Sequence, residues 1–172
     1  MVDSIDDQRR TDPPFTGGER ELHEAWLEYH RTTLLLKCEG LDVAGLRARP
    51  VPTSLMSLHG LVRHMAEVER NWFRRVLAGE DLLGGIYWSD ERPEGDFEML
   101  DDEMFADDLA VWEGEVAKAR EIAAAHELDD TGVRRGNPVS LRWIYGHMLE
   151  EYARHNGHAD LIRELVDGAV GE

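Results

Sequence analysis

Residues 150–158, EEYARHNGH, place two glutamates and two histidines within nine residues. On a helix, Glu151 and His155 lie one turn apart on the same face, so their side chains can reach a common point. A carboxylate and an imidazole that meet in this way can bind a divalent metal ion, and zinc and nickel suit such oxygen and nitrogen ligands. A plain salt bridge between successive helical turns is the alternative interpretation of this pair.

Helical periodicity sorts the side chains of this segment into inward and outward ones. The apolar stripe of residues 140–166 is centred on Met148 and also contains Leu141, Ile144, Tyr145, Tyr152, Ala159, Ile162 and Val166. At about 100° per residue, His155 lies about 20° and Glu151 about 60° from the centre, whereas Glu150 lies at about 160°. Glu151 and His155 are therefore the predicted inward pair, and Glu150 faces solvent. A buried carboxylate is costly unless it is paired or bound to a metal, so Glu151 needs such a partner.

A metal site needs at least a third ligand from another segment. The remaining histidine candidates are His23, His30, His59, His64 and His126. The helix expected over residues 54–78 has its apolar centre at Met65, and His64 lies about 100° and His59 about 120° away, on opposite sides. Periodicity does not choose between them, and a single inward histidine is more often a hydrogen-bonded core residue than a ligand. Glu69 lies about 40° from the same centre, which makes it a candidate ligand or an acceptor behind one.

Four amphipathic segments are expected to position these side chains, at residues 19–39, 54–78, 102–125 and 140–166. The predicted inward residues of the first three are Leu22, Trp26, Tyr29, Thr33 and Leu36; Leu55, Leu58, Leu61, Val62, Met65, Val68, Trp72 and Val76; and Phe105, Leu109, Trp112, Val116, Ala119 and Ala123. The opposite face of the second helix is expected to carry Arg63, Glu67, Arg70 and Arg74. No convincing strand is found, so the expected fold class is all-α, a four-helix bundle.

The connections between these helices are longer than minimal. Residues 80–101 exceed the roughly 2–8 residues usual between bundle helices, which is typical of a functional loop. The Ile-Tyr-Trp sequence at 86–88 is expected to pack onto the bundle or over an opening. Residues 1–17 are polar, contain Pro-Pro and Gly-Gly breakers, and are interpreted as an N-terminal tail. Residues 18–170 are expected to form a single domain.

The composition argues against several classes of partner. The formal net charge of −17 repels phosphate backbones and anionic lipids, so neither nucleic acid nor a membrane surface is an expected partner. No apolar run approaches the ~20 residues that span a bilayer, and the first residues lack the apolar core of a secretory signal. The single cysteine, Cys38, excludes an internal disulfide. These features predict a cytoplasmic protein.

Two segments resemble a known family. SLHGLVRHMAEVERNWFRRVLAGE (57–80) resembles the second helix of the DinB/YfiT-like metal-binding four-helix bundles, and LRWIYGHMLEEYARHNGHADLIREL (141–165) resembles their last helix. The pattern is that of an actinobacterial subfamily of unknown function, in a superfamily that includes mycothiol-dependent maleylpyruvate isomerase and bacillithiol S-transferases. The resemblance covers most of the chain from Glu19 to Val166, and it implies a DinB-like four-helix bundle with long crossover loops.

The resemblance also implies a set of metal ligands. HMAEVE matches the family's H-x-x-x-x-E pattern and selects His64 rather than His59. The family's last helix supplies two ligands four residues apart, usually both histidine. Here His155 aligns with the second of them and Glu151 takes the first position, as in the mycothiol-dependent isomerase branch, while His158 falls where the family often has glutamine. The implied metal ligands are therefore His64, Glu151 and His155.

Three protein ligands leave an open position on a metal ion, which suits chemistry more than structural support. A thiol bound there loses its proton and becomes a nucleophile near neutral pH. Cys38, at the end of the first helix, is interpreted as a buried apolar residue rather than as this thiol. The resemblance instead implies mycothiol as the low-molecular-weight thiol, Zn²⁺ or Ni²⁺ as the metal, a small electrophile as the substrate, and a homodimer.

The expected function is therefore that of a metal-dependent thiol S-transferase or isomerase. Glu69, Tyr152 and His158 are the candidates for residues behind the metal or beside the substrate. One alternative is a non-catalytic bundle that binds a metal or a small ligand, or acts in a stress response. Another is a purely structural role, in which the inward glutamate and histidine form a buried hydrogen-bonded pair.

Overall fold

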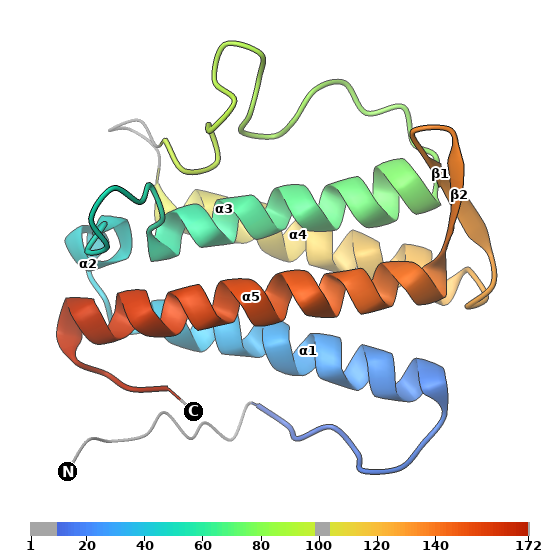
Figure 1. Cartoon of the computed structure of the whole chain (residues 1–172), viewed down its shortest axis with the longest axis horizontal. Coiled ribbons are helices and arrows are strands. Elements are labelled where there is room, and N and C mark those ends of the chain that lie inside the picture. Colours follow the sequence, from blue (N-terminus) through green and yellow to red (C-terminus); the bar gives the residue numbers. More distant parts are fainter. Residues whose placement is uncertain (1–9, 99–103, 172) are drawn as a thin grey trace.

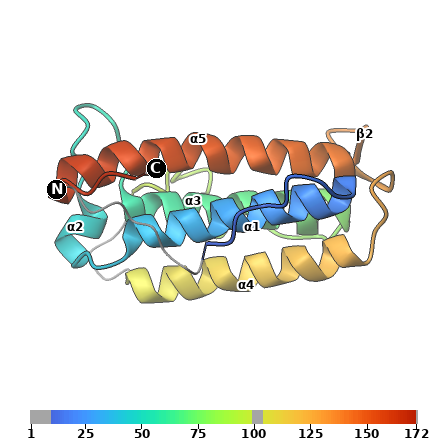
Figure 2. The ribbon, with the colours of Figure 1, turned by 90° about the horizontal axis from the view of Figure 1, so that it is seen from below.

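Four long helices run along one another in the computed structural model, which describes residues 10–98 and 104–171 (Figures 1 and 2). They are α1 (Glu19–Cys38), α3 (Leu58–Glu69) with its π-helical continuation η1 (Arg70–Leu77), α4 (Phe105–Ala124) and α5 (Leu141–Asp167). α1 packs mainly on α5, and α3 packs mainly on α4. The predicted all-α four-helix bundle is confirmed. No helix among the described residues is long and apolar enough to cross a membrane.

The long connection after η1 determines the direction of the helices. Residues 79–98 run back along the bundle, so that α4 starts at the same end as α3 and points the same way (Figure 1). Within this connection, Ile86 and Tyr87 pack against the core as expected. Trp88 is 39% exposed and lies beside a cleft. The crossover therefore forms a cover over one face of α3.

Polar side chains and glycines set the ends of the helices. The hydroxyl of Ser57 accepts a hydrogen bond from the amide of Gly60, so α3 starts at Leu58, four residues later than the pattern predicted. Ser140 caps α5 in the same way. α5 ends at Asp167 and is followed by Gly168, whose φ of +79° is the left-handed conformation that glycine adopts without strain. The end of α5 agrees with the predicted segment to within a residue.

Two short elements were not predicted. A helical turn, α2 (Val43–Arg47), interrupts the connection between α1 and α3, and a hairpin of β1 (Thr131–Arg134) and β2 (Asn137–Ser140) precedes α5. The prediction of no strand was therefore wrong. Arg135 and Gly136 form the hairpin turn with φ values of +50° and +80°, the signature of a two-residue turn. Strands of four residues that contain glycine and proline carry no clear alternation of apolar side chains.

The predicted inward face of α1 was wrong in part. Thr33 and Leu36 are buried, but Trp26 is 45% exposed and the core is filled by Leu27 and Leu34 instead. Arg31 is also buried on this helix. Hydrophobic periodicity could not place a charged residue in the core, and this displaced the predicted stripe toward Trp26.

The predicted outward face of α3 was also wrong in part, because the crossover covers it. Arg63 is fully buried and Glu67 is 9% exposed. The guanidinium of Arg63 donates to the carbonyl of Gly95 and lies over the ring of Tyr87. Glu67 accepts hydrogen bonds from the amides of residues 86 and 87. The inward residues predicted for α4 and α5 are buried or partly buried as expected.

Candidate metal centre

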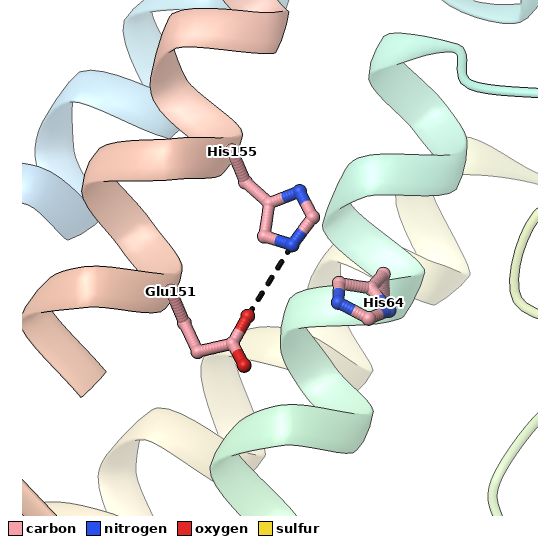
Figure 3. A group of neighbouring side chains, drawn as sticks. All are labelled: His64, Glu151 and His155. Carbon is pink, nitrogen blue, oxygen red and sulfur yellow. Dashed lines mark ion pairs between the residues drawn. The ribbon is translucent and has the colours of Figure 1, made fainter. Parts of the chain in front are cut away.

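His64 on α3 faces Glu151 and His155 on α5 across the space between these two helices (Figure 3). The Nε2 atom of His155 lies 3.4 Å from a carboxylate oxygen of Glu151, and the rings of His64 and His155 have centroids 4.5 Å apart. One ligand atom of each residue lies within 4.8 Å of the other two. Two imidazoles and one carboxylate at this spacing fit a divalent ion with bonds of about 2 Å after a small inward movement.

The two helices hold this group at the edge of the core. Glu151 and His155 are one turn apart on α5, beside the fully buried Met148 and Tyr152. The side chains of Glu151 and His155 are 18% and 12% exposed, so the group is neither sealed nor on the open surface. Partial exposure allows a metal ion and a ligand to reach it.

The charge state of Glu151 suits a cation. The hydrogen bond with His155 holds the pKa of Glu151 below its usual range, with smaller contributions from His147 and His64, although burial opposes the shift. The other carboxylate oxygen lies 3.2 Å from Nε2 of His147. Glu151 is therefore an ionised carboxylate at neutral pH.

Asp96 on the crossover is a part of the site that sequence reasoning missed. Its Oδ2 atom lies 2.8 Å from Nδ1 of His64, and the ring of Phe97 stacks on the same imidazole. A carboxylate on Nδ1 makes that nitrogen the donor and leaves Nε2 as the lone-pair donor for a metal. Asp96 lies 32 residues from His64 in the chain, so no local pattern joins the two.

Asp96→Ala is expected to weaken metal binding roughly 10–100-fold, the usual cost of losing the partner of a histidine ligand. The measurement is the zinc dissociation constant from competition with a chelator. Asp90→Ala is the matched control, because Asp90 is an exposed aspartate on the same crossover. Equal affinities for Asp96→Ala and Asp90→Ala would contradict the assigned role of Asp96.

A cleft of about 320 Å³ opens beside the group. His64, Glu151 and Asp96 line it, together with Trp72 and Trp88. The cleft offers a ligand access to two of the three candidate metal ligands. A small molecule in the cleft would thus meet both aromatic side chains and metal-binding side chains.

The family model described as mycothiol-S-transferase matches residues 22–168. The chain belongs to this family. It is a DinB-like protein, so the predicted family is confirmed, and all three candidate ligands lie within the matched residues. Membership indicates a mycothiol S-transferase-like function, with a low-molecular-weight thiol as partner. No curated protein matches the chain in sequence.

Two of the other candidate residues lie away from the ligand group of this mycothiol-S-transferase family member. Both carboxylate oxygens of Glu69 bind Arg31, at 2.9 and 2.8 Å. The hydroxyl of Tyr152 donates to Glu69 at 2.7 Å and accepts from Nε1 of Trp112. This Arg31 network, defined by Arg31, Glu69, Trp112 and Tyr152, joins α1, α3, α4 and α5. The structure thus places Glu69 and Tyr152 in a buried hydrogen-bonded cluster.

His158 and His59 lie in different surroundings, one beside the ligand group and the other in the core. His158 lies next to His155, with their Nδ1 atoms 3.5 Å apart, and burial lowers the pKa of His158. His59 is fully buried and its Nε2 lies 2.7 Å from Asp108 on α4. The structure therefore brings His64, not His59, to the Glu151–His155 pair.

Among the described residues, a second group that could hold a metal comprises His147, Glu150 and Glu151.

Cys38 has the properties of an unreactive core residue. It is buried, and burial raises the pKa of its thiol to about 12. A thiol with so high a pKa stays protonated at neutral pH and is a poor nucleophile. In a mycothiol-S-transferase the reacting sulfur comes from the small thiol, so Cys38 is not needed for that role.

Proposed function

We propose that the protein is a metal-dependent S-transferase that joins mycothiol to a small electrophile. The observation that carries this proposal is the meeting of His64, Glu151 and His155 beside a cleft that two of them line, in a chain of the mycothiol-S-transferase family. Three protein donors fall one short of the four that close a structural zinc site. The proposed centre is therefore one that accepts an exogenous ligand.

The donor set is consistent with Zn²⁺ or Ni²⁺. Two neutral imidazoles and one carboxylate supply nitrogen and oxygen ligands and a single negative charge. A bound divalent cation would lower the pKa of a thiol that reaches it, so that the thiolate is available at neutral pH. His64, Glu151 and His155 would hold that cation, and Asp96 would hold the imidazole of His64 in the required tautomer.

The cleft would bind the electrophile next to these ligands. Trp72 and Trp88 line it and would exclude water from one side of the reacting thiolate.

We also propose that residues 18–170 form one domain and that the protein is a homodimer. We propose further that it works in the cytoplasm, where low-molecular-weight thiols are kept reduced.

The proposal is tested with purified protein, mycothiol and a panel of small electrophiles. We expect stoichiometric metal by elemental analysis and conjugation above the uncatalysed rate. Activity should disappear with the metal on chelation and return with Zn²⁺ or Ni²⁺. Cysteine in place of mycothiol is the control for thiol specificity.

Two other results would overturn parts of this assignment. Stoichiometric metal without turnover of any thiol would leave the non-catalytic binding protein as the function. No metal, and no rise in melting temperature with Zn²⁺ or Ni²⁺, would leave Glu151 and His155 as a structural pair.

A further inference from the structure

Arg134 is a cation of the cleft that has no acidic partner among residues 10–98 and 104–171. It is the last residue of β1, and its guanidinium carbon lies 4.1 Å from the centroid of a Trp72 ring. The stacked guanidinium donates no hydrogen bond within the described part of the chain. All five of its N–H donors are therefore available to a ligand.

The hairpin holds Arg134 in a defined place. A Cβ atom at Gly132 would lie 1.8 Å from the carbonyl oxygen of Val76, so β1 packs backbone against backbone on η1. Residues i and i+2 of a strand share a face. Arg134 therefore points to the same side as Gly132, toward η1 and Trp72, while Val133 between them is 64% exposed. This close contact places the backbone of β1 beside η1, and the guanidinium of Arg134 lies over Trp72 of the same helix.

The carboxylates that line the same cleft are already engaged. Glu151 contacts His147 and His155, Asp96 contacts His64, and Glu67 accepts from two crossover amides, at 2.5 and 2.7 Å. None of the three forms an ion pair with Arg134. Their negative charges still repel a dianion such as a phosphate monoester, which leaves a monoanion as the favoured ligand.

We propose that Arg134 binds a carboxylate group of the electrophile and so makes the enzyme selective for electrophilic carboxylic acids. The proposal rests on the proposed S-transferase function. A guanidinium fork matches a carboxylate through two parallel N–H···O hydrogen bonds. Mycothiol carries no carboxylate, so the anion belongs to the second substrate. In the reaction, the thiolate sulfur forms a bond to carbon and the leaving group departs with the electron pair of the bond that breaks.

Chloroacetate and chloroacetamide test this selectivity, because they share the reacting carbon and the chloride leaving group and differ in the carboxylate. Their kcat/KM values with mycothiol are compared for wild type, Arg134→Gln, Arg134→Lys and Arg135→Gln. Arg135 is the matched control: it is the next residue, exposed at the hairpin turn, and its loss changes the net charge equally.

Arg134→Gln is expected to lower kcat/KM for chloroacetate roughly 10–100-fold, as for the loss of a hydrogen bond to a charged group. The value for chloroacetamide should stay unchanged, Arg134→Lys should recover part of the loss, and Arg135→Gln should affect neither substrate. Equal losses for both substrates would overturn the proposal. So would a loss that appears as a raised KM for mycothiol, which would assign Arg134 to the thiol.

A binding measurement separates this subsite from the chemistry. Fluorine NMR of trifluoroacetate, an unreactive carboxylate, is recorded with metal-free wild type and the same variants. We expect trifluoroacetate to bind wild type and Arg135→Gln equally well. It should bind Arg134→Gln more weakly, by a factor similar to the loss expected in kcat/KM for chloroacetate. Arg134-dependent binding without turnover would support the anion subsite while the S-transferase function fails. Binding that is absent, or that is unaffected by Arg134→Gln, would remove the subsite.

Discussion

Glu69→Gln is expected to lower the free energy of unfolding by about 3–5 kcal/mol, the cost of leaving one partner of a buried ion pair uncompensated. Glu69 is fully buried and Arg31 is 4% exposed, so the guanidinium would lose its only buried counter-charge among the described residues. The melting temperature of a chain of this length should fall by roughly 6–20 °C. Thermal and urea unfolding, followed by circular dichroism, measure the change.

Glu28→Gln is the control for this prediction. Glu28 also contacts Arg31, at 2.7 Å, but its side chain is 42% exposed. Ion pairs at such positions contribute at most about 1 kcal/mol, so this variant should unfold close to wild type. Equal stability of the Glu28 and Glu69 variants would contradict the assignment of the Arg31 network as a stabilising cluster.

The Arg31 network also leads to a prediction about metal binding by the Glu69→Gln variant. Both oxygens of Glu69 bind Arg31, so below its melting temperature the Glu69→Gln variant should still carry stoichiometric metal. A double replacement, Arg31→Met with Glu69→Leu, should recover part of the lost stability, because apolar pairs can replace buried ion pairs. Loss of metal without loss of stability would instead place Glu69 among the ligands.

His155→Ala is expected to abolish stoichiometric metal binding and, with it, conjugation of mycothiol. Removing one of three donors should weaken metal binding by more than the roughly 10–100-fold that the loss of a supporting residue costs. Elemental analysis of the purified variant and its zinc dissociation constant are the measurements. Full metal occupancy in His155→Ala would remove His155 from the ligand set.

His158→Ala is the matched control for the ligand prediction. His158 lies on the same helix, its ring centroid is 5.4 Å from that of His155, and it is outside the group whose ligand atoms converge. This variant should keep its metal, and its melting temperature should rise on adding zinc as that of wild type does. Metal loss equal to that of His155→Ala would make His158 part of the centre.

Much of the α5 half of the site follows from the sequence. The angular positions of Glu151 and His155 relative to Met148 predicted that both face the bundle, and both are partly buried there. This prediction works because a helix turns by a constant angle per residue, so neighbours along the chain determine which side chains share a face. His64 needed more than periodicity, since it and His59 lie at about 100° and about 120° from the apolar centre, on opposite sides. The family motif selected His64.

The other part of the site and the buried charged residues depended on contacts between residues far apart in the chain. Asp96 reaches His64 only because the crossover folds back over α3. The same cover buries Arg63 and Glu67, which an amphipathic pattern assigns to solvent. Arg31 enters the core because Glu69 on another helix compensates its charge. Hydrophobic patterns record which residues prefer burial and not which charges find partners.

By itself, the sequence determined the all-α bundle, its family, and the inward pair Glu151 and His155, because helical periodicity is a local property of the chain. Only the tertiary structure decided that Asp96 supports His64, that Glu69 belongs to the Arg31 network, and that Arg134 stands over Trp72 beside the candidate metal centre. The contacts of Asp96 and Arg134 arise from a crossover and a hairpin, whose paths depend on packing against the finished bundle and leave no periodic signal in the sequence. The pairing of Glu69 with Arg31 joins two helices that lie far apart in the chain.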